Sequence, residues 1–111
     1  SGTGLIVLPD NFTTIHRRLI IGLASQHHIP AIYPYRYFVD AGGLLSYGVD
    51  VTDLFARAAA YVSRILRGAN PGDLPIQAPT KFELVINLKT AKILGLRVPR
   101  ILRVGADALI E

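Results

Sequence analysis

Residues 29–48 read Ile-Pro-Ala-Ile-Tyr-Pro-Tyr-Arg-Tyr-Phe-Val-Asp-Ala-Gly-Gly-Leu-Leu-Ser-Tyr-Gly, and the other predicted elements are arranged around this segment. It begins with a short apolar run at 31–33, which predicts a buried strand. Pro34 ends that strand, because proline has no N–H group to donate to a sheet. Four aromatic residues then follow closely on one another: Tyr33, Tyr35, Tyr37 and Phe38. Aromatic and hydroxyl groups at a strand end are typical of the ligand-binding edge of an open α/β sheet, although tyrosines more often lie at the rim of a core.

A strand and a helix precede this stretch and complete a βαβ unit. The apolar run Leu5–Leu8 shows no alternation, which is typical of a parallel strand covered on both faces. Asn11 or Thr13 can cap the helix that follows, and its apolar stripe runs to about His27. Because strand, helix and strand follow one another at this spacing, we predict parallel strands joined by a right-handed crossover.

The chain beyond Gly48 contains the clearest helical pattern. Apolar residues recur at helical spacing over 51–66, with Asp50 or Thr52 as the N-cap and Gly68 as the stop. The elements expected after it are a turn at 70–73, an extended proline-bounded segment at 74–78, a strand at 83–87, a short helix at 89–94 and a last helical turn from Pro99 toward Ala106. The predicted fold class is therefore α/β, with a mostly parallel sheet flanked by helices in three layers.

The composition of the chain excludes several classes of function. The 111 residues suit one domain or one lobe of a larger protein, and half of them are hydrophobic. The net charge is +4, but no run of cationic residues exceeds two, so we predict no nucleic-acid partner. Cysteine is absent, which excludes disulfides and thiolate metal sites, and no apolar stretch is long enough for a membrane-spanning helix. The chain begins almost directly in a strand, from which we expect it to be a piece of a longer protein.

The sequence shows no catalytic or metal-binding motif. His27 and His28 are adjacent, so on a helix their side chains diverge by about 100° and cannot easily share a metal ion. Ser46 lacks the Gly-x-Ser-x-Gly context of a hydrolase nucleophile, and Gly42-Gly43 lacks the spacing of a nucleotide-binding loop. We therefore predict a protein that is not an enzyme and that carries no cofactor or metal.

An ordered set of segments runs through the chain. These are Leu-Ile-Val-Leu-Pro-Asp, Ile-Pro-Ala-Ile-Tyr, Gly-Gly-Leu-Leu-Ser-Tyr-Gly, Ile-Leu-Arg-Gly, Asn-Pro-Gly-Asp-Leu-Pro-Ile-Gln and Ile-Asn-Leu-Lys-Thr-Ala-Lys-Ile-Leu-Gly-Leu-Arg-Val-Pro. In this order they resemble the C-terminal part of ABC-transporter substrate-binding proteins, in the family that includes tryptophan-binding lipoproteins. The resemblance covers essentially the whole chain, and no single motif carries it.

The resemblance implies a type I periplasmic-binding-protein fold, in which two α/β lobes trap a solute in the cleft between them. Residues 1–48 would form the βαβ portion of the C-terminal lobe. Residues 49–111 would form the crossing segment, the long helix and the closing strands and helices that pack on the other lobe. Such a protein delivers its solute to an ABC permease for import. The implied location is periplasmic or membrane-anchored and extracytoplasmic, with the signal outside this chain.

The resemblance also implies ligand contacts at strand ends. Asp10 follows the first strand and Tyr35 the second, while Tyr47 and Gly48 fall at the crossing between the lobes. An aspartate can receive an ammonium group, and tyrosines can stack on a ring or bind a carboxylate, which suggests an amino-acid-like or aromatic solute. The competing interpretation is that Asp10 caps the next helix and the tyrosines only pack.

Two other hypotheses remain open at this point. The same lobe architecture serves as the effector-sensing domain of transcription regulators and sensor proteins. Separately, a lone half of a two-lobed protein would expose the apolar stripe of the helix at 51–66. Because exposed apolar surface of that size tends to be covered by a second copy, we expect a homodimer, with the segment after Gly48 as a candidate for exchange between chains.

Overall fold

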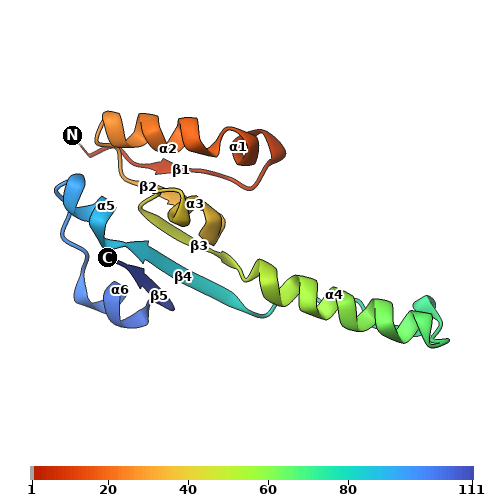
Figure 1. Cartoon of the computed structure of the whole chain (residues 1–111). Coiled ribbons are helices and arrows are strands. Elements are labelled where there is room, and N and C mark those ends of the chain that lie inside the picture. The colour runs from red at the N-terminus through yellow and green to blue at the C-terminus, as the bar shows by residue number, and fades with distance from the viewer. Residues whose placement is uncertain (1) are drawn as a thin grey trace.

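The computed structural model describes residues 2–111, and its centre is a five-stranded sheet in the order β1-β2-β3-β4-β5 (Figure 1). The strands are β1 (Leu5–Ile6), β2 (Ala31–Tyr33), β3 (Leu45–Val49), β4 (Phe82–Asn87) and β5 (Ala108–Ile110). β1, β2 and β3 are parallel, β4 is antiparallel to β3, and β5 is parallel to β4. The predicted α/β class with a mostly parallel sheet is therefore confirmed.

Two helices connect β1 to β2, where we predicted one. They are α1 (Asn11–Ile15) and α2 (Arg17–Gln26), and the chain leaves helical geometry between them at His16, whose φ and ψ are −95° and 16°. The predicted strand over Leu5–Leu8 is also shorter, although Val7 N still donates to Ile32 O at 2.9 Å beyond the end of β1. The βαβ connection itself is present, since β1 and β2 are adjacent and parallel.

The N-cap of α1 is Asp10, as the competing interpretation of that residue expected, and neither Asn11 nor Thr13. Asp10 Oδ1 accepts a hydrogen bond from Phe12 N at 2.8 Å. Asn11 is already the first helical residue, and the Thr13 hydroxyl donates backward to Leu8 O at 2.9 Å. The Asp10 carboxylate and the Thr13 hydroxyl therefore stabilise the turn that leads from the first strand into α1.

The aromatic residues after β2 build a short helix and the centre of the core. α3 (Arg36–Asp40), which the sequence pattern did not reveal, inserts Phe38 beneath α2 with its side chain fully buried. The Phe38 ring stacks on Tyr33 with a centroid distance of 5.3 Å. The buried cluster comprises Val7, Ile21, Ala24, Ala31, Tyr33 and Phe38. Most of these aromatic residues therefore do pack, as the more conservative reading of the sequence expected.

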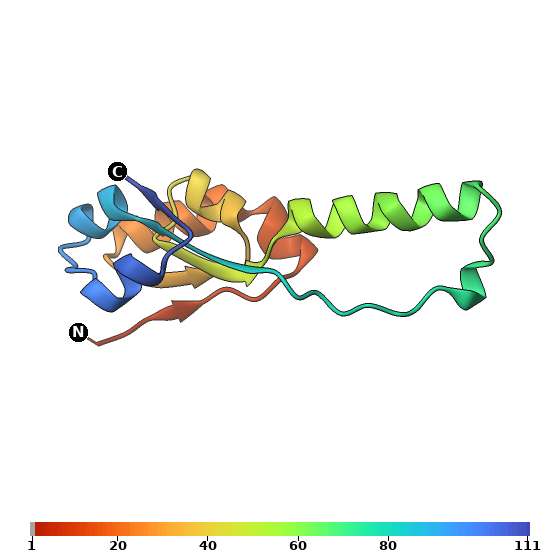
Figure 2. The same ribbon diagram turned by 90° about the horizontal axis from the view of Figure 1, so that it is seen from below.

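The long helix α4 (Val51–Leu66) projects away from the sheet and has no buried residue (Figures 1 and 2). Its bounds are those predicted, its N-cap is Asp50 rather than Thr52, and Gly68 follows its end with φ of 108°. A 3-10 turn, η1 (Pro71–Asp73), then reverses the chain, and an extended segment returns to β4 alongside the helix (Figure 2). We call residues 50–81 the arm and the remainder of the chain the body.

The C-terminal elements complete the body. α5 (Leu88–Ile93) follows β4 directly, Gly95 ends it with φ of 71°, and α6 (Arg100–Gly105) begins after Pro99. The predicted short helix and the last helical turn are both present, whereas β5 was not predicted. Helices α2, α3 and α5 lie on one face of the sheet and α6 lies on the other (Figures 1 and 2). Helices therefore flank the sheet on both sides.

Candidate ligand-binding groove

A groove of about 620 Å³ separates the body from the first turns of α4. The body contributes two segments: the turn before α1 together with that helix, and the start of α3 together with the residue before it. The helix contributes an apolar wall. The lining residues are Pro9, Asp10, Asn11, Thr14, Tyr35, Tyr37, Val51, Leu54, Phe55 and Ala58. A volume of this size, apolar on one side with few polar groups on the other, is typical of a small-molecule site.

Asp10 supplies the carboxylate of the groove. It follows a parallel strand at the sheet edge where the β1 and β2 strands end, which is where open α/β sheets bind ligands. One oxygen, Oδ1, is engaged by Phe12 N in capping α1. The side chain is therefore held by the helix cap while it lines the groove, so the two interpretations of Asp10 in the sequence are compatible with each other.

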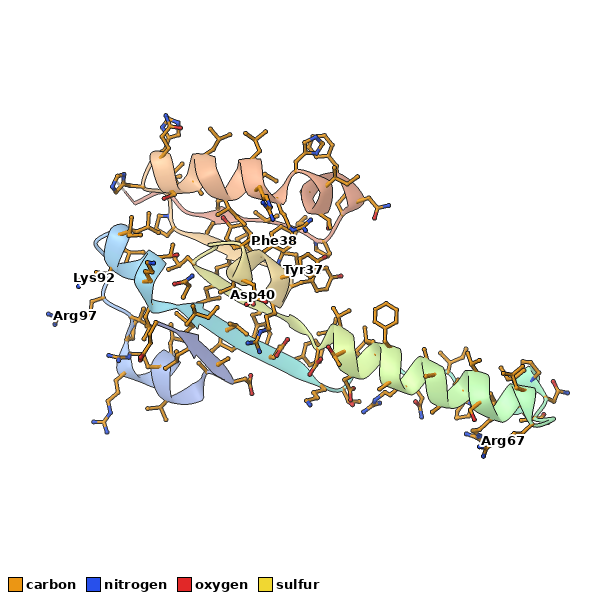
Figure 3. All side chains as sticks on the ribbon, viewed as in Figure 1. Tyr37, Phe38, Asp40, Arg67, Lys92 and Arg97 are labelled. Atoms are coloured by element: carbon orange, nitrogen blue, oxygen red, sulfur yellow. The ribbon has the colours of Figure 1, made fainter. Side chains whose placement is uncertain are left out.

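Tyr35 and Tyr37 form a stacked aromatic pair on the body side. Their ring centroids are 5.4 Å apart, and Tyr37 also stacks on the buried Phe38 at 5.2 Å. The Arg17 guanidinium carbon lies 5.5 Å from the Tyr37 centroid, and the Tyr37 and Thr14 hydroxyl oxygens are 3.5 Å apart. Figure 3 shows Tyr37 on the side of the body from which α4 departs. The pair is therefore anchored to the core and presents a fixed aromatic surface.

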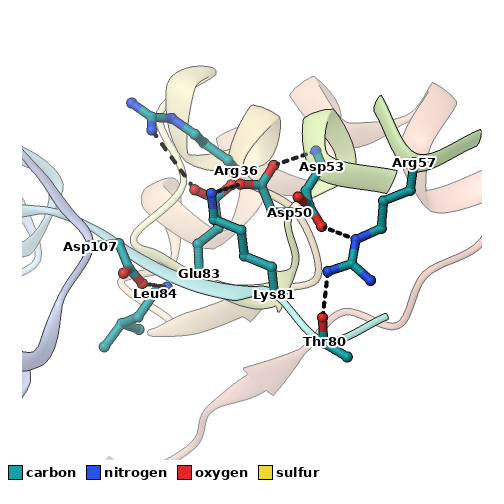
Figure 4. A network of polar contacts seen from close by, with 9 residues as sticks. All are labelled: Arg36, Asp50, Asp53, Arg57, Thr80, Lys81, Glu83, Leu84 and Asp107. Carbon is teal, nitrogen blue, oxygen red and sulfur yellow. Dashed lines mark hydrogen bonds and ion pairs between the residues drawn. The ribbon is translucent and has the colours of Figure 1, made fainter. Parts of the chain in front are cut away.

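A chain of polar contacts joins the first turns of α4 to the end of the segment that returns from it (Figure 4). Asp50 Oδ1 accepts from Asp53 N at 3.1 Å, and Asp50 Oδ2 lies 3.5 Å from Lys81 Nζ. Asp53 Oδ2 pairs with Arg57 Nε at 3.0 Å, and the same guanidinium donates to Thr80 Oγ1 at 2.7 Å. These contacts hold the two ends of the arm together where they leave the sheet, which is where the apolar wall of the groove begins.

A second pair of charges lies where the arm meets β4 (Figure 4). Arg36 NH1 is 4.0 Å from Glu83 Oε2, and Arg36 Nε is 3.8 Å from Asp40 Oδ1. Burial and then the nearby charge of Asp50 raise the pKa of Glu83, against the opposing effect of Arg36. The hydrogen bond from Asp53 N, helped by Lys81, instead lowers the pKa of Asp50.

The structure brings together two of the four residues predicted to contact a ligand. Asp10 and Tyr35 line the groove, whereas Tyr47 and Gly48 do not. Tyr47 stacks on Phe82 with a centroid distance of 6.1 Å and is 59% exposed. A Cβ atom on Gly48 would lie 1.9 Å from Pro34 O, so glycine is needed there for close packing of two backbone segments. Because neither residue lines the groove, their contact role at the crossing between the lobes stays a prediction.

The groove also includes residues that the sequence did not single out for a ligand. Thr14 lies in α1, Tyr37 lies in α3, and Phe55 lies one turn into α4. The signal for Tyr37 was present in the run of aromatic residues. Phe55 was hidden, because an apolar residue at helical spacing is normally read as core.

The described residues show neither a metal centre nor a membrane span. Residues 2–111 contain no group of three or more His, Cys, Asp or Glu side chains placed to hold a metal ion. Within the same part of the chain, no helix has the length and apolar character needed to cross a bilayer.

The comparison with known proteins identifies the class. The model of the family described as ABC transporter substrate binding protein matches residues 1–110, so the chain belongs to that family. The sequence resemblance is therefore confirmed. The chain is 28% identical over 93 residues to a tyrosine-binding protein of Clostridioides difficile (strain R20291), a match that covers 84% of this chain and 27% of that protein.

Two solved structures are similar in fold. A conserved domain protein from Vibrio cholerae O1 biovar El Tor superposes with a TM-score of 0.87 and 29% identity. An ABC domain in complex with L-Trp from Streptococcus pneumonia superposes with a TM-score of 0.86 and 27% identity. Each match covers 95% of this chain and 36% of the other. The chain thus spans about a quarter to a third of the length of these relatives.

Proposed function

We propose that this chain forms one wall of a solute-binding site, and that the solute is an aromatic amino acid or a close analogue. The single observation that carries the proposal is the groove itself. It places the Asp10 carboxylate, a stacked tyrosine pair and the apolar first turns of α4 around one volume of about 620 Å³. The tyrosine-binding relative and the L-Trp complex of a related domain support the same solute class.

Each group has a defined chemical task in this proposal. Asp10 Oδ1 caps α1, and Oδ2 accepts a charge-assisted hydrogen bond from the ammonium group of the solute. Tyr35 stacks on the aromatic ring, since aromatic pairs are favourable beyond the area that they bury. Phe55 and Leu54 cover the ring from the α4 side.

The proposal extends to the whole protein. In it, residues 1–48 belong to the C-terminal lobe, whose sheet β4 and β5 complete, and the crossing segment and long helix after residue 49 pack on the other lobe. The solute lies in the cleft between lobes and is handed to an ABC permease for import. The protein is not an enzyme and works in a periplasmic or membrane-anchored extracytoplasmic location. Membership of the substrate-binding family supports these points.

Isothermal titration calorimetry of the protein with L-tyrosine, L-tryptophan and 3-indolepropionate tests the site. Asp10→Asn is a sharp variant, because asparagine keeps a capping oxygen and removes the charge. We expect it to weaken the binding of both amino acids by about 10- to 100-fold, because a hydrogen bond to a charged group contributes about that much affinity. It should leave 3-indolepropionate, which has no ammonium group, unchanged. Tyr35→Ala should weaken all three ligands.

Tyr47→Ala is the matched control, because Tyr47 lies outside the groove and is exposed. Its affinities should equal those of the wild type. Failure of all three ligands to bind, or an equal affinity of wild type and Asp10→Asn for L-tryptophan, would count against the proposed site.

We also propose that the arm mediates self-association when it is not covered by another lobe. Phe55 is 72% and Leu66 is 82% exposed, and both belong to the apolar residues of α4. The returning segment covers only one flank of the helix, where the Tyr61 hydroxyl donates to Pro75 O at 2.5 Å. Light scattering coupled to size exclusion should give the mass of a homodimer, and Phe55→Ser should reduce it. A monodisperse wild-type monomer would remove this part of the proposal.

A further inference from the structure

Cationic residues gather in one C-terminal segment without any acidic residue among them. Five of the twelve Lys and Arg residues lie between Glu83 and Asp107, and this interval contains neither aspartate nor glutamate. They are Lys89, Lys92, Arg97, Arg100 and Arg103. We call this group the cationic end. Elsewhere in the chain, acidic and basic residues are interspersed, so the excess positive charge is local.

The fold concentrates these side chains at one end of the body. They come from α5, from the loop after it and from α6, and all five residues are exposed. Figure 3 shows Lys92 and Arg97 pointing into solvent at the end of the molecule opposite α4, whose far tip carries Arg67. Within residues 2–111, none of the five forms an ion pair, whereas Arg36, Arg57 and Lys81 do.

Three of the cations surround a shallow hollow of about 240 Å³. Lys92, Arg97 and Arg103 form its charged rim, and its other lining residues are Leu88, Ala91, Leu96 and Val98. Cations that converge on a hollow with an apolar floor suit an anionic group attached to an apolar body. Arginine in particular binds phosphate groups through a planar set of donors.

Exposed apolar side chains lie directly beside the charges on α6. Ile101 is 82% and Val104 is 75% exposed. At about 100° per residue, Arg103, Arg100, Val104 and Ile101 share one arc of about 160° around the helix. The surface is therefore both cationic and apolar, a combination typical of segments that lie at a membrane interface.

We infer that the cationic end is a docking surface for the surface of an anionic phospholipid bilayer. Phosphate headgroups pair with the five cations, and one headgroup occupies the hollow. Ile101 and Val104 enter the boundary between headgroups and acyl chains. The exposed apolar pair favours a bilayer over a nucleic acid, because a nucleic acid offers no apolar phase to receive it. This inference does not depend on the solute groove, which lies on the α4 side of the body.

Co-sedimentation of the protein with vesicles tests the inference. The vesicles are pure phosphatidylcholine or an equal mixture of phosphatidylcholine and phosphatidylglycerol. Arg97→Gln/Arg103→Gln removes two charges from the rim of the hollow. Arg18→Gln/Arg67→Gln is the matched control, because both arginines are exposed, lie elsewhere and take part in no ion pair within residues 2–111. Circular dichroism checks that each variant is folded.

We expect sedimentation only with phosphatidylglycerol vesicles, weakening sharply as salt shortens the screening length. Each cation at such a surface raises the affinity for the vesicle about fivefold, so the variant that lacks two cations should bind roughly 30-fold more weakly than the wild type. The control variant should stay close to the wild type. Ile101→Ser should weaken binding without reducing its salt dependence.

Three results would overturn the inference. One is absence of wild-type binding to phosphatidylglycerol vesicles. Another is an equal loss in the two double variants, which would mean that net charge alone is responsible. The last is tighter, rim-dependent binding to a single-stranded oligonucleotide with no effect of Ile101→Ser, which would assign the cationic end to nucleic acid.

Discussion

Replacement of Gly48 by alanine should be among the most damaging single-methyl changes in this protein. The added Cβ would lie 1.9 Å from Pro34 O and 3.1 Å from Pro34 C. Both partners are backbone atoms, so no side-chain rotation relieves the contact. The distance between the new Cβ and Pro34 O would have to increase by about 1.1 Å to reach 3.0 Å, below which real Cβ atoms essentially never lie. Because Pro34 joins β2 to the tyrosine pair, that movement would also shift the groove.

Overpacking of a well-ordered interior costs about 1–3 kcal/mol, and a rigid backbone partner places Gly48→Ala at the upper end. We therefore expect a loss of about 3 kcal/mol from a total free energy of unfolding of about 5–15 kcal/mol. Urea denaturation followed by circular dichroism measures it. Gly22→Ala is the control, since nothing lies within 4 Å of its added Cβ and alanine favours helix, with an expected gain of about 1 kcal/mol. A Gly48→Ala protein as stable as the wild type would refute the reasoning.

Three further predictions use the same denaturation assay. Phe38→Ala should lower the free energy of unfolding by about 3–5 kcal/mol, because the side chain is fully buried, and a loss below 1 kcal/mol would contradict this packing. Glu83→Gln should raise the free energy of unfolding near pH 7, because burial and the Asp50 charge raise the pKa of Glu83 and make its ionised form unfavourable. The gain should vanish at a pH below the pKa of glutamate in the unfolded chain. A loss of stability at pH 7 would show that the ion pair with Arg36 dominates. Thr90→Val should cost about 1–2 kcal/mol by removing the 2.9 Å hydrogen bond to Gly42 O, and no change would show that water replaces it.

Elements with strong periodicity were predictable from the sequence. The strand at 31–33 and the helix at 51–66 have the predicted bounds, because apolar spacing, proline and capping residues agree there. α3 was missed, since a run of aromatic residues is common to strands and turns and only tertiary packing of Phe38 makes it helical. β5 was missed because three residues carry no period. The antiparallel direction of β4 depends on pairing, which a local pattern does not encode.

The site was predictable to the extent that strand ends are. Asp10 and Tyr35 follow neighbouring parallel strands, so topology alone brings them to one edge. Tyr47 lies on a strand of the same sheet, but side chains alternate between faces, and Tyr47 points to the face opposite the buried Ser46. The position of Phe55 in the groove could be predicted only by knowing the direction in which α4 leaves the sheet. That direction is set by contacts distant in sequence, such as Arg57 with Thr80.

In terms of chain topology, the arm is one closed connection between two adjacent antiparallel strands. Val49 pairs with Phe82, and Asp50 N donates to Lys81 O at 2.9 Å, so both ends of the connection leave the sheet at the same place. Closure entropy grows only with the logarithm of length, and halving or doubling a flexible connection changes it by about 0.6 kcal/mol. Because α4 also has no buried residue, we expect the β3–β4 ladder to form with a longer or a shorter arm.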